Sequence, residues 1–411
     1  MDRFALLAMT ETFPAEAKHP RRIMIERNIF TEDHTLFRDM VRRFLDDHAK
    51  PHHEKWEAQG YVDRDVWLKA GEQGLLLPTV STEYGGAGAT EAMSSVLIEE
   101  VARANTSGLG FGLHNDIVAP YIETYGSEAQ KKKYLPAMAR GEKIGAIAMT
   151  EPGTGSDLQG VRTTARRDGD HWVINGSKTF ITNGWHADLV IVVTKTDVNA
   201  GAKGVSLIIV DEGTPGFRKG KRLKKVGLKS QDTSELFFDD VRVPADNLLG
   251  KEGEGFIYLM QKLPWERLQI AITAHASAQA AIDHTVQYVQ DRKAFGSPIG
   301  EFQNTRYKLA ECQTEVEVGR VFVDKCLEMQ IAGTLDSATA SMAKLWLSEM
   351  QGRVLDTCVQ LHGGYGFMWE YPVAQAYADA RVQRIYGGTS EIMKELISRQ
   401  MGLGAGKKKP A

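Results

Sequence analysis

The strongest constraint on the fold of this sequence is a series of long amphipathic runs in its last third. Apolar residues recur with the period of an α-helix over about residues 254–292, 303–331, 336–361 and 389–401. The links between these runs are short, and long helices joined by short links pack side by side in an antiparallel bundle. The sequence therefore predicts a helical bundle over residues 253–402.

A helical period also governs residues 31–143, and Thr31 is placed to cap the first helix of this region. The predicted apolar face of that helix consists of Leu36, Phe37, Met40, Val41, Phe44 and Leu45. We therefore expect an N-terminal helical domain. Residues 1–30 have no clear period and are expected to be an extension, and the Lys-rich residues 403–411 are expected to be a disordered tail.

Between the two helical regions, over residues 144–252, the period changes to two. Short apolar runs alternate with the hairpin signals Asp168-Gly169, Asn175-Gly176 and Asn183-Gly184. We expect a small antiparallel β domain, folded as a barrel or a sandwich. The predicted fold class is therefore mostly α with a central β domain.

Composition argues against several classes of protein. The formal net charge of −3 gives no electrostatic reason to expect a nucleic-acid partner. The longest apolar runs, such as residues 189–193, are too short to span a bilayer, and residues 4–9 are too short for the apolar core of a signal peptide. Cys312, Cys326 and Cys358 lie far apart without a metal-ligand spacing, so we expect no metal and reduced thiols in a cytosol-like compartment.

The segment Ala148–Asp157 turns sharply, because Pro152 fixes one φ angle while Gly153 and Gly155 permit conformations closed to other residues. Its hydroxyl and backbone N–H groups could hold a flat ligand with polar edges, such as a flavin ring, or an anion. On this segment alone, a solvent-exposed turn is an equally good interpretation. A second glycine-rich segment, His362–Gly366, interrupts the predicted bundle, and such loops often carry function.

Five motifs in order along the chain resemble the acyl-CoA dehydrogenase family. Ala148–Asp157, Gln360–Gly366 and Arg381–Arg399 resemble three signatures of that family, and Arg292–Gly296 and Gln303 also match. The order of the domains agrees as well. The resemblance implies an N-terminal helical domain, a small antiparallel β-barrel and a C-terminal four-helix bundle, with FAD held non-covalently.

The resemblance also implies which residues bind the cofactor. These are Ile147, Met149, Thr150, Gly155, Ser156, Phe180, Ile181, Thr182, Phe295, Thr389, Ser390 and Glu391. A neighbouring chain would contribute Arg292, Gln303, Gln360, Leu361, His362, Gly363 and Gly364. An arginine can pair with a pyrophosphate through two hydrogen bonds, and a glycine-rich loop exposes N–H groups to phosphate oxygens. On the residue pattern alone, a charge that stabilises a helix C-terminus is the simpler interpretation of Arg292.

The implied reaction is α,β-dehydrogenation of an acyl-CoA thioester. A carboxylate removes the α-proton while the β-hydrogen leaves as hydride to the flavin. Most of the family carries this base directly after the tyrosine of the third motif, where this chain has Gly387. Glu266 stands instead where isovaleryl and long-chain members carry theirs, and its apolar neighbours predict a raised pKa that suits a general base. A solvated Glu266 paired with a cation is the alternative.

The implied substrate contacts include the third motif. Gly387 is expected to offer its backbone N–H to the thioester oxygen, and its missing side chain is expected to leave room for Glu266. The residues implied to bind the substrate are Ser156, Arg267, Gly387 and Gly388.

The C-terminal third most resembles the long-chain members of the family. Gly108, Gly110 and Gly112 are expected to leave a deep cavity for the acyl tail. A branched-chain, isovaleryl-like substrate, an acyl-CoA oxidase activity and a non-catalytic assembly scaffold are the alternatives. The resemblance implies electron-transferring flavoprotein as the electron acceptor, a homotetramer arranged as a dimer of dimers, and a location in a bacterial cytoplasm or a mitochondrial matrix.

Overall fold

The computed structural model describes residues 25–404. Most of the expected extension and tail, residues 1–24 and 405–411, lie outside this range. The described end of the extension is anchored to the helices, because the Arg27 guanidinium pairs with Asp324 at 2.6 Å and with a buried carboxylate of the N-terminal domain at 2.7 Å. This segment therefore joins the first helical domain to the bundle.

The N-terminal domain is helical, as predicted. Its helices are α1 Glu32–His48, α2 His53–Gln59, α3 Arg64–Glu72, α4 Glu91–Arg103, α5 Phe111–Leu113, α6 Ala119–Tyr125 and α7 Glu128–Ala139. One turn of π-helix, His114–Val118, lies between α5 and α6. Thr31 is the N-cap residue of α1, as predicted. The prediction that Leu36 is buried is wrong, because α1 packs on α4 through the turns that carry Val41 and Phe44.

The central domain is one mixed sheet. Its strands are β1 Gly145–Ala148, β2 Thr164–Asp168, β3 His171–Thr182, β4 Leu189–Lys195, β5 Val205–Asp211, β6 Phe217–Arg222, β7 Thr233–Pro244 and β8 Leu248–Leu249. The strand order is β6-β7-β3-β2-β4-β5-β8, with β1 paired to β4. The expectation of purely antiparallel pairing is corrected at β4, which runs parallel to β1 and β2. The reason is that β7 occupies the free edge of β3, so β4 pairs beyond β2 instead of beside β3.

One predicted hairpin is confirmed and two are wrong. Asn183-Gly184 lies in the turn after β3, but β3 does not pair with β4. Asp168-Gly169 leads into the turn between the antiparallel strands β2 and β3. Asn175-Gly176 makes no turn and lies inside β3, where the register against β7 shifts. A Cβ on Gly176 would meet Thr163 Oγ1 at 2.4 Å, so the glycine permits a close approach within a bulged strand. Pairing with β7 along most of β3 outweighs the local turn signal.

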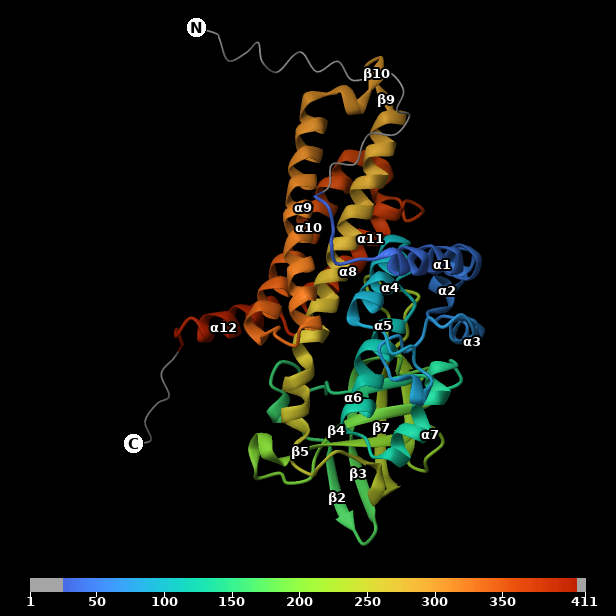
Figure 1. Cartoon of the computed structure of the whole chain (residues 1–411), viewed down its shortest axis with the longest axis vertical. Helices are drawn as coiled ribbons and strands as arrows, with labels where there is room; N and C mark the ends of the chain where they lie inside the picture. Colours follow the sequence, from blue (N-terminus) through green and yellow to red (C-terminus); the bar gives the residue numbers. More distant parts are fainter. Residues whose placement is uncertain (1–24, 405–411) are drawn as a thin grey trace.

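The C-terminal domain is built on three long helices, α8 Gly255–Asp291, α9 Gln303–Ile331 and α10 Ser337–His362, as predicted. The strands β9 Lys293–Ala294 and β10 Ser297–Pro298 form the hairpin that joins α8 to α9. The sequence pattern missed α11 Pro372–Ala380, which packs against α8 and α10. The last predicted helix, α12 Ser390–Gln400, contacts the α10 helix and projects away from the body (Figure 1).

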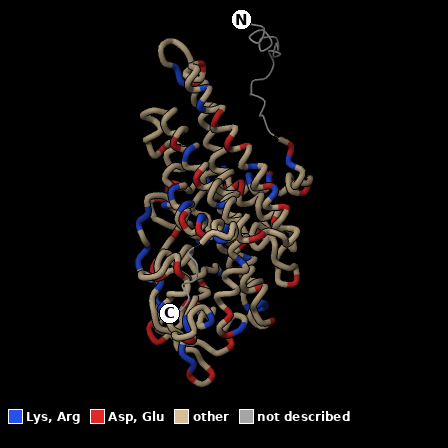
Figure 2. The backbone as a smooth tube through the Cα atoms, turned by 90° about the vertical axis from the view of Figure 1, so that its left-hand side faces the viewer, with Lys and Arg blue, Asp and Glu red and all other residues tan. Residues whose placement is uncertain are grey.

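Helix α8 connects the three regions. Its N-terminal end lies beside the β domain, its middle contacts α4, and its C-terminal end reaches the β9–β10 hairpin at the far tip of the bundle (Figure 1). Side chains near the middle of α8 therefore face both the N-terminal domain and the sheet. Lys and Arg alternate with Asp and Glu along the chain, so the view in Figure 2 has no face of a single sign.

Candidate active site

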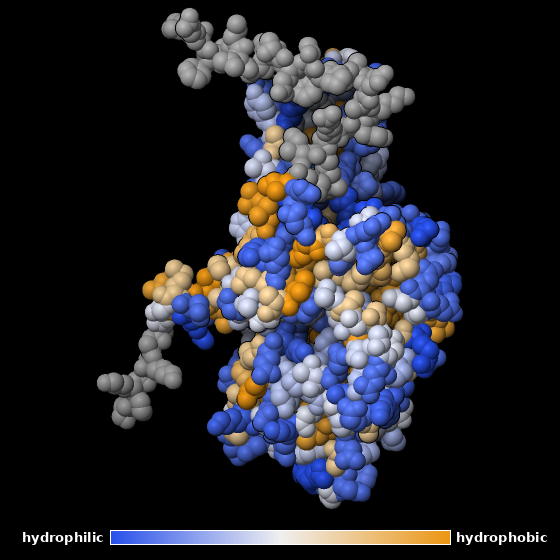
Figure 3. Space-filling view, in the orientation of Figure 1, coloured by the Kyte–Doolittle hydropathy of each residue, from blue (hydrophilic) through white to orange (hydrophobic). Residues whose placement is uncertain are grey.

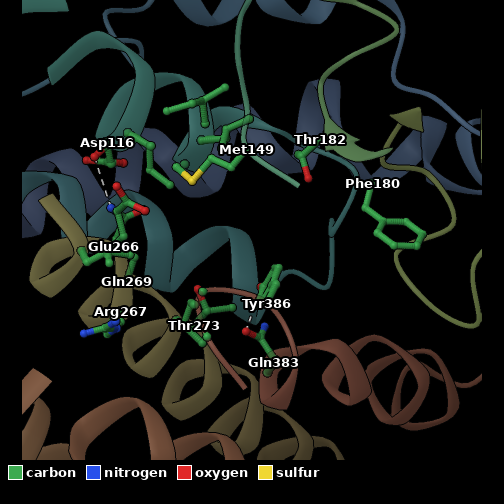
Figure 4. Close-up of a pocket in the computed structure, with 18 of the residues that line it drawn as sticks. Asp116, Met149, Phe180, Thr182, Glu266, Arg267, Gln269, Thr273, Gln383 and Tyr386 are labelled. Atoms are coloured by element: carbon green, nitrogen blue, oxygen red, sulfur yellow. Dashed lines mark hydrogen bonds between the residues drawn. The ribbon is translucent and has the colours of Figure 1, made fainter. Parts of the chain in front are cut away.

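A cavity of about 780 Å³ lies where the three domains meet. Residues of α4, the π-helical turn, the loop after β1, the end of β3, the first half of α8, and α12 with the segment before it contribute to its wall. The lining side chains are mostly apolar, with a few polar groups pointing inward, as is typical of a small-molecule site (Figure 4). Ile147, Met149, Thr150, Gly155, Ser156, Phe180, Ile181, Thr182, Glu266, Arg267, Gly387 and Gly388 all line this cavity, as the sequence predicted them to share a site.

The glycine-rich loop after β1 is held by a buried ion pair. The Glu151 carboxylate accepts hydrogen bonds from the Lys178 ammonium at 2.8 Å, the Arg162 N–H at 2.7 Å and the Thr163 N–H at 2.9 Å. Lys178 also donates to the carbonyl of Met149 at 3.1 Å. Burial lowers the pKa of Lys178 to about 8. Burial would raise the pKa of Glu151, but Lys178 and Thr163 hold it below its usual value. The loop is therefore a fixed part of the cavity wall.

The end of β3 turns Phe180 toward the cavity. The register of β3 against β7 shifts between Lys178 and Ile181, and Phe180 has a φ of 59°. Bulges of this kind often lie beside functional sites, where they redirect one side chain. Lys178 is thereby buried under the loop, while the Phe180 ring stays 67% exposed next to Thr182 (Figure 4).

Glu266 is a buried acid in the cavity wall. Only 8% of the residue is exposed, and its Oε1 accepts a hydrogen bond from the Tyr121 hydroxyl at 3.1 Å. Burial raises the pKa of Glu266 to about 7, and the opposing effects of Tyr121, Arg267 and Lys262 do not cancel that rise. Within residues 25–404 it forms no salt bridge, so the solvated, cation-paired alternative is wrong. A carboxyl group in this state can accept a proton near neutral pH.

Gly387 lies on the cavity wall for a different reason from the one predicted. Its φ is +62°, and a Cβ there would meet Cδ1 of Ile270 at 2.4 Å. The expectation that the missing side chain leaves room for Glu266 is therefore wrong, because Ile270, one helical turn further along α8, fills that space. The carbonyl of the next residue, Gly388, accepts a hydrogen bond from the buried Lys344 ammonium at 2.7 Å, which fixes the loop.

Arg267 lines the cavity, but other residues hold its guanidinium. Its Nη1 donates to the hydroxyls of Ser337 at 3.0 Å and Ser341 at 3.3 Å on α10. Figure 4 shows the side chain turned away from Glu266. Burial lowers the pKa of Arg267, and Glu266 opposes this effect. In this chain, Arg267 therefore ties α8 to α10 beside the cavity.

The remaining predicted cofactor residues lie elsewhere. Arg292 stacks over the Tyr365 ring at 5.5 Å, and the Tyr288 hydroxyl donates to the His362 carbonyl at 3.1 Å, so these residues form one cluster near the bundle tip. Phe295, Gln303, Gln360, Leu361, Gly363 and Gly364 belong to the same end of the bundle. Thr389, Ser390 and Glu391 begin α12 and do not line the cavity. The structure therefore brings the predicted residues of β1, β3 and α8 together around one cavity. The predicted cofactor residues at the bundle tip and at the start of α12 lie outside that cavity.

Two features of the cavity were not found from the sequence pattern. Asp116, on the π-helical turn, and Gln269, on α8, place polar groups in the wall near Glu266 (Figure 4). The polar run His114-Asn115-Asp116 between the apolar residues Leu113 and Ile117 is the signal that could have found the first. Two of the three glycines do not create the cavity, because a Cβ would meet Ser230 at 2.4 Å from Gly108 and Asn183 at 1.9 Å from Gly110, so these two permit close packing. A Cβ on Gly112, which lines the cavity, would meet only Oε1 of Gln269 at 3.9 Å.

Comparison with known protein families gives matches along the whole of the described fold. Residues 31–142 match the acyl-CoA dehydrogenase N-terminal domain, residues 146–241 the middle domain and residues 253–402 the C-terminal domain of that family. The mitochondrial long-chain specific acyl-CoA dehydrogenase of Sus scrofa is 54% identical over 91% of this chain and 88% of its own length. The mitochondrial isovaleryl-CoA dehydrogenase of Oryza sativa subsp. japonica is 36% identical over 91% and 92%.

Solved structures agree in fold. An acyl-CoA dehydrogenase from Geobacillus kaustophilus superposes with a TM-score of 0.90 at 51% identity, covering 92% of this chain and all of the other. A glutaryl-CoA dehydrogenase from Mycobacterium smegmatis in complex with FADH2 superposes with a TM-score of 0.86 at 30% identity, covering 92% and 97%. Among the described residues, no helix is both long enough and apolar enough to cross a membrane.

Proposed function

The chain belongs to the acyl-CoA dehydrogenase family, and we propose that its substrate is a long-chain fatty acyl-CoA thioester. It is an FAD-dependent oxidoreductase of acyl-CoA. The higher identity to the long-chain relative than to the isovaleryl relative, 54% against 36%, supports a long chain over a branched short one. The observation that carries the catalytic proposal is the buried Glu266 carboxyl in the wall of the 780 Å³ cavity.

The residues of this chain suit each role in the reaction. Glu266 takes the α-proton, and the hydrogen bond from Tyr121 to Oε1 leaves Oε2 to receive it. The backbone N–H of Gly387, on the same wall, polarises the thioester oxygen as negative charge develops there. Bound FAD supplies the acceptor for the β-hydrogen, which leaves as hydride. The α-proton on Glu266 and this hydride account for both hydrogens, and a double bond forms between the two carbons.

The wall opposite Glu266 fits a flavin. Phe180 offers an aromatic face, Met149 and Ile181 offer apolar surface, and Thr182 offers a hydroxyl at the edge. A Cβ on Gly155 would meet nothing within 4 Å, so the loop leaves open space on that side. The ion pair between Glu151 and Lys178 keeps this wall in position without occupying the cavity.

A panel of acyl-CoA substrates tests the function. We expect the purified protein to carry FAD and to lose its yellow colour on anaerobic addition of a saturated long-chain acyl-CoA. With a dye acceptor, kcat/KM should rise from short to long chains. Higher kcat/KM for isovaleryl-CoA than for any long chain would overturn the chain-length proposal, and flavin that no acyl-CoA bleaches would favour the scaffold alternative. Rapid reoxidation by oxygen would favour an oxidase over transfer to electron-transferring flavoprotein.

We infer a homotetramer, arranged as a dimer of dimers, in which the bundle tip of one chain completes the cofactor site of another. The support is that Arg292 and the Gln360–Gly364 loop do not line the cavity of their own chain. Apolar side chains also gather around α12 and the adjoining bundle (Figure 3), and Ile385, Met401 and Leu403 are exposed there. Light scattering should give four times the chain mass, and a monomer that retains FAD at low concentration would contradict the inference.

Arg292→Ala should weaken FAD retention more than fold stability. A charge-assisted hydrogen bond to pyrophosphate contributes about 1.5–3 kcal/mol, so the FAD dissociation constant should rise roughly 10- to 100-fold. The thermal midpoint of the apoprotein should stay near that of the wild-type apoprotein. Lys293→Ala, which removes the adjacent exposed cation, is the matched control. Unchanged flavin content in the Arg292 variant would count against the cross-subunit role.

The remaining assignments concern partner and location. Electron-transferring flavoprotein is the family's electron acceptor, and we propose that it receives electrons from this chain too. We also propose that the enzyme works where fatty acids are oxidised, in a bacterial cytoplasm or a mitochondrial matrix. The mitochondrial relatives support the second of these locations.

A further inference from the structure

A buried lysine holds the loop that carries Gly387. Lys344, on α10, is fully buried, and its ammonium donates a hydrogen bond to the carbonyl of Gly388 at 2.7 Å. Lys344 does not line the cavity, whereas Gly387 and Gly388 do. Within residues 25–404, this ammonium forms no ion pair. A buried charge without a counterion lowers stability, so a neutral donor would hold the loop with a smaller loss.

The charged groups around Lys344 do not supply a counterion. Glu349, on the same helix, pairs with Arg384 at 3.3 Å. Arg267, on α8, is a second cation, and Glu391, on α12, is exposed. Burial and Arg267 lower the pKa of Lys344 to about 8, and the two carboxylates oppose this effect. The ammonium is therefore charged at neutral pH and loses its proton not far above it.

The loop itself has little conformational preference. Gly387 has a φ of +62° and Gly388 a φ of +97°, values that glycine adopts freely and other residues rarely adopt. The Tyr386 N–H donates to the Val382 carbonyl at 3.1 Å. The loop is therefore anchored by Tyr386 before Gly387 and by Lys344 after it.

The N–H of Gly387 lies between these two anchors. No group among the described residues 25–404 accepts a hydrogen bond from it. Gly387 contributes to the cavity wall, and Ile270 fills the space that its side chain would occupy. A donor that stabilises a developing oxyanion must be placed accurately, because a misplacement of about 1 Å can lower the rate roughly 100-fold.

We propose that Lys344 is a positioning residue for the dehydrogenation, which holds the Gly387 N–H against the thioester oxygen by binding the Gly388 carbonyl. The inference rests on the proposed function, in which this N–H donates to that oxygen. A charged donor makes a shorter and stronger hydrogen bond than a neutral one, so the ammonium fixes a loop that glycine leaves free. Its positive charge, close to the loop, also favours negative charge on an oxygen bound there.

Lys344→Met tests the inference, because it retains an unbranched side chain of similar length without the ammonium. The rate of flavin reduction at saturating long-chain acyl-CoA should fall about 10- to 100-fold, while the Kd of that acyl-CoA should change less than about threefold. Anaerobic stopped-flow absorbance gives both values. Lys394→Met, which removes an exposed cation of α12, is the matched control and should match wild type in both.

Infrared spectroscopy separates positioning from a purely structural role. The probe is the enoyl-CoA product of the long-chain substrate, isotopically labelled at the thioester carbonyl and bound to the oxidised holoenzyme. A polarised carbonyl absorbs at a lower frequency, so its stretch should lie below that of the free ligand in wild type. It should move back toward the free value in Lys344→Met. Lys344→Arg, which retains a charged donor, should restore part of both the frequency shift and the rate.

The pH dependence is a second measurement. As Lys344 loses its proton through about pH 8, its hydrogen bond loses its charge, so the reduction rate and the frequency shift should both decline. Lys344→Arg should lack this decline, although Lys178, whose pKa is also about 8, is unchanged in that variant.

Stability should change in the opposite direction. The native pKa of about 8 lies below the ordinary 10.5, so the unfolded state binds the proton more tightly. From pH 8 toward 10.5, wild type should therefore gain thermal stability relative to Lys344→Arg while it loses rate. A loss of folded enzyme cannot produce that combination.

The outcomes separate this inference from the proposed function. A Lys344→Met enzyme with the wild-type rate, or a slow one with the wild-type carbonyl stretch, would overturn the role of Lys344 and leave the dehydrogenase function intact. A decline above pH 8 that persists in Lys344→Arg would also overturn it. If neither variant folds, a wild-type carbonyl stretch that stays constant through about pH 8 decides against it. Failure of every acyl-CoA to reduce the wild-type flavin would reject the proposed function itself.

Discussion

Glu266→Gln should lower the rate of flavin reduction by acyl-CoA by a factor on the order of 10² to 10⁴, the usual contribution of a general base. The amide keeps the shape of the side chain and can still accept a hydrogen bond from Tyr121, but it cannot take the α-proton. FAD content and acyl-CoA affinity should therefore change little. Stopped-flow absorbance of the flavin under anaerobic conditions measures this rate directly.

The control for this variant is Glu391→Gln. Glu391 is an acid of the third motif, but it is exposed at the start of α12 and does not line the cavity. Its replacement should leave the reduction rate of the FAD-saturated enzyme close to that of wild type. Reduction at the wild-type rate in Glu266→Gln, with a slow Glu391→Gln, would move the base to Glu391.

The raised pKa of Glu266 also gives a pH dependence to both activity and stability. The base works when ionised, so flavin reduction should rise with pH through about 7. The native pKa of about 7 lies above the ordinary value of 4.5, so the native state binds the proton more tightly than the unfolded state. This contribution to stability is complete below pH 4.5 and is lost as the pH rises toward 7. Relative to wild type, Glu266→Gln should gain thermal stability over that window.

Lys178→Met should cause the largest loss of stability. The change leaves Glu151 buried beneath the cavity loop without its cation, and removing one partner of a buried pair costs about 3–5 kcal/mol. The Met149 carbonyl loses its hydrogen bond at the same time, so the loop that faces the flavin is no longer fixed. We expect a lower thermal midpoint and a lower FAD content in the purified protein.

The double variant Lys178→Met with Glu151→Gln separates charge from packing. It removes the uncompensated carboxylate, so much of the lost stability should return, while FAD content should stay low because the loop contact is still missing. Lys69→Met is the surface control, since it breaks an exposed ion pair with Asp65 and should cost under about 1 kcal/mol. A Lys178→Met variant as stable as this control would show that the buried pair does not hold the loop.

The sequence by itself determined the order of the elements and indicated Glu266 as the candidate base. The helical period over about residues 254–292 and 303–331 predicted α8 and α9, because long amphipathic helices repeat one strong local signal many times. Glu266 was indicated because it stands where isovaleryl and long-chain members of the resembling family carry their base, and its apolar neighbours along the chain predicted a raised pKa. The resemblance of short motifs then indicated the family before any three-dimensional information.

The tertiary structure decided what depends on contacts between distant residues. Asn175-Gly176 has the local signal of a turn, but β7 pairs across it and keeps β3 continuous. The reason that residue 387 is glycine lies in its positive φ and in the contact with Ile270, from a helix more than a hundred residues earlier.

The polar groups around the cavity also depend on contacts between residues that are distant in the sequence. The pairing of Lys178 with Glu151, and the position of Asp116 near Glu266, bring together residues that no period or spacing connects. Burial changes the pKa of each of these groups, and burial is a property of the packed fold. The sequence could therefore indicate the proposed base and much of the cavity wall, whereas the packing of the three domains decided which other charges surround the site.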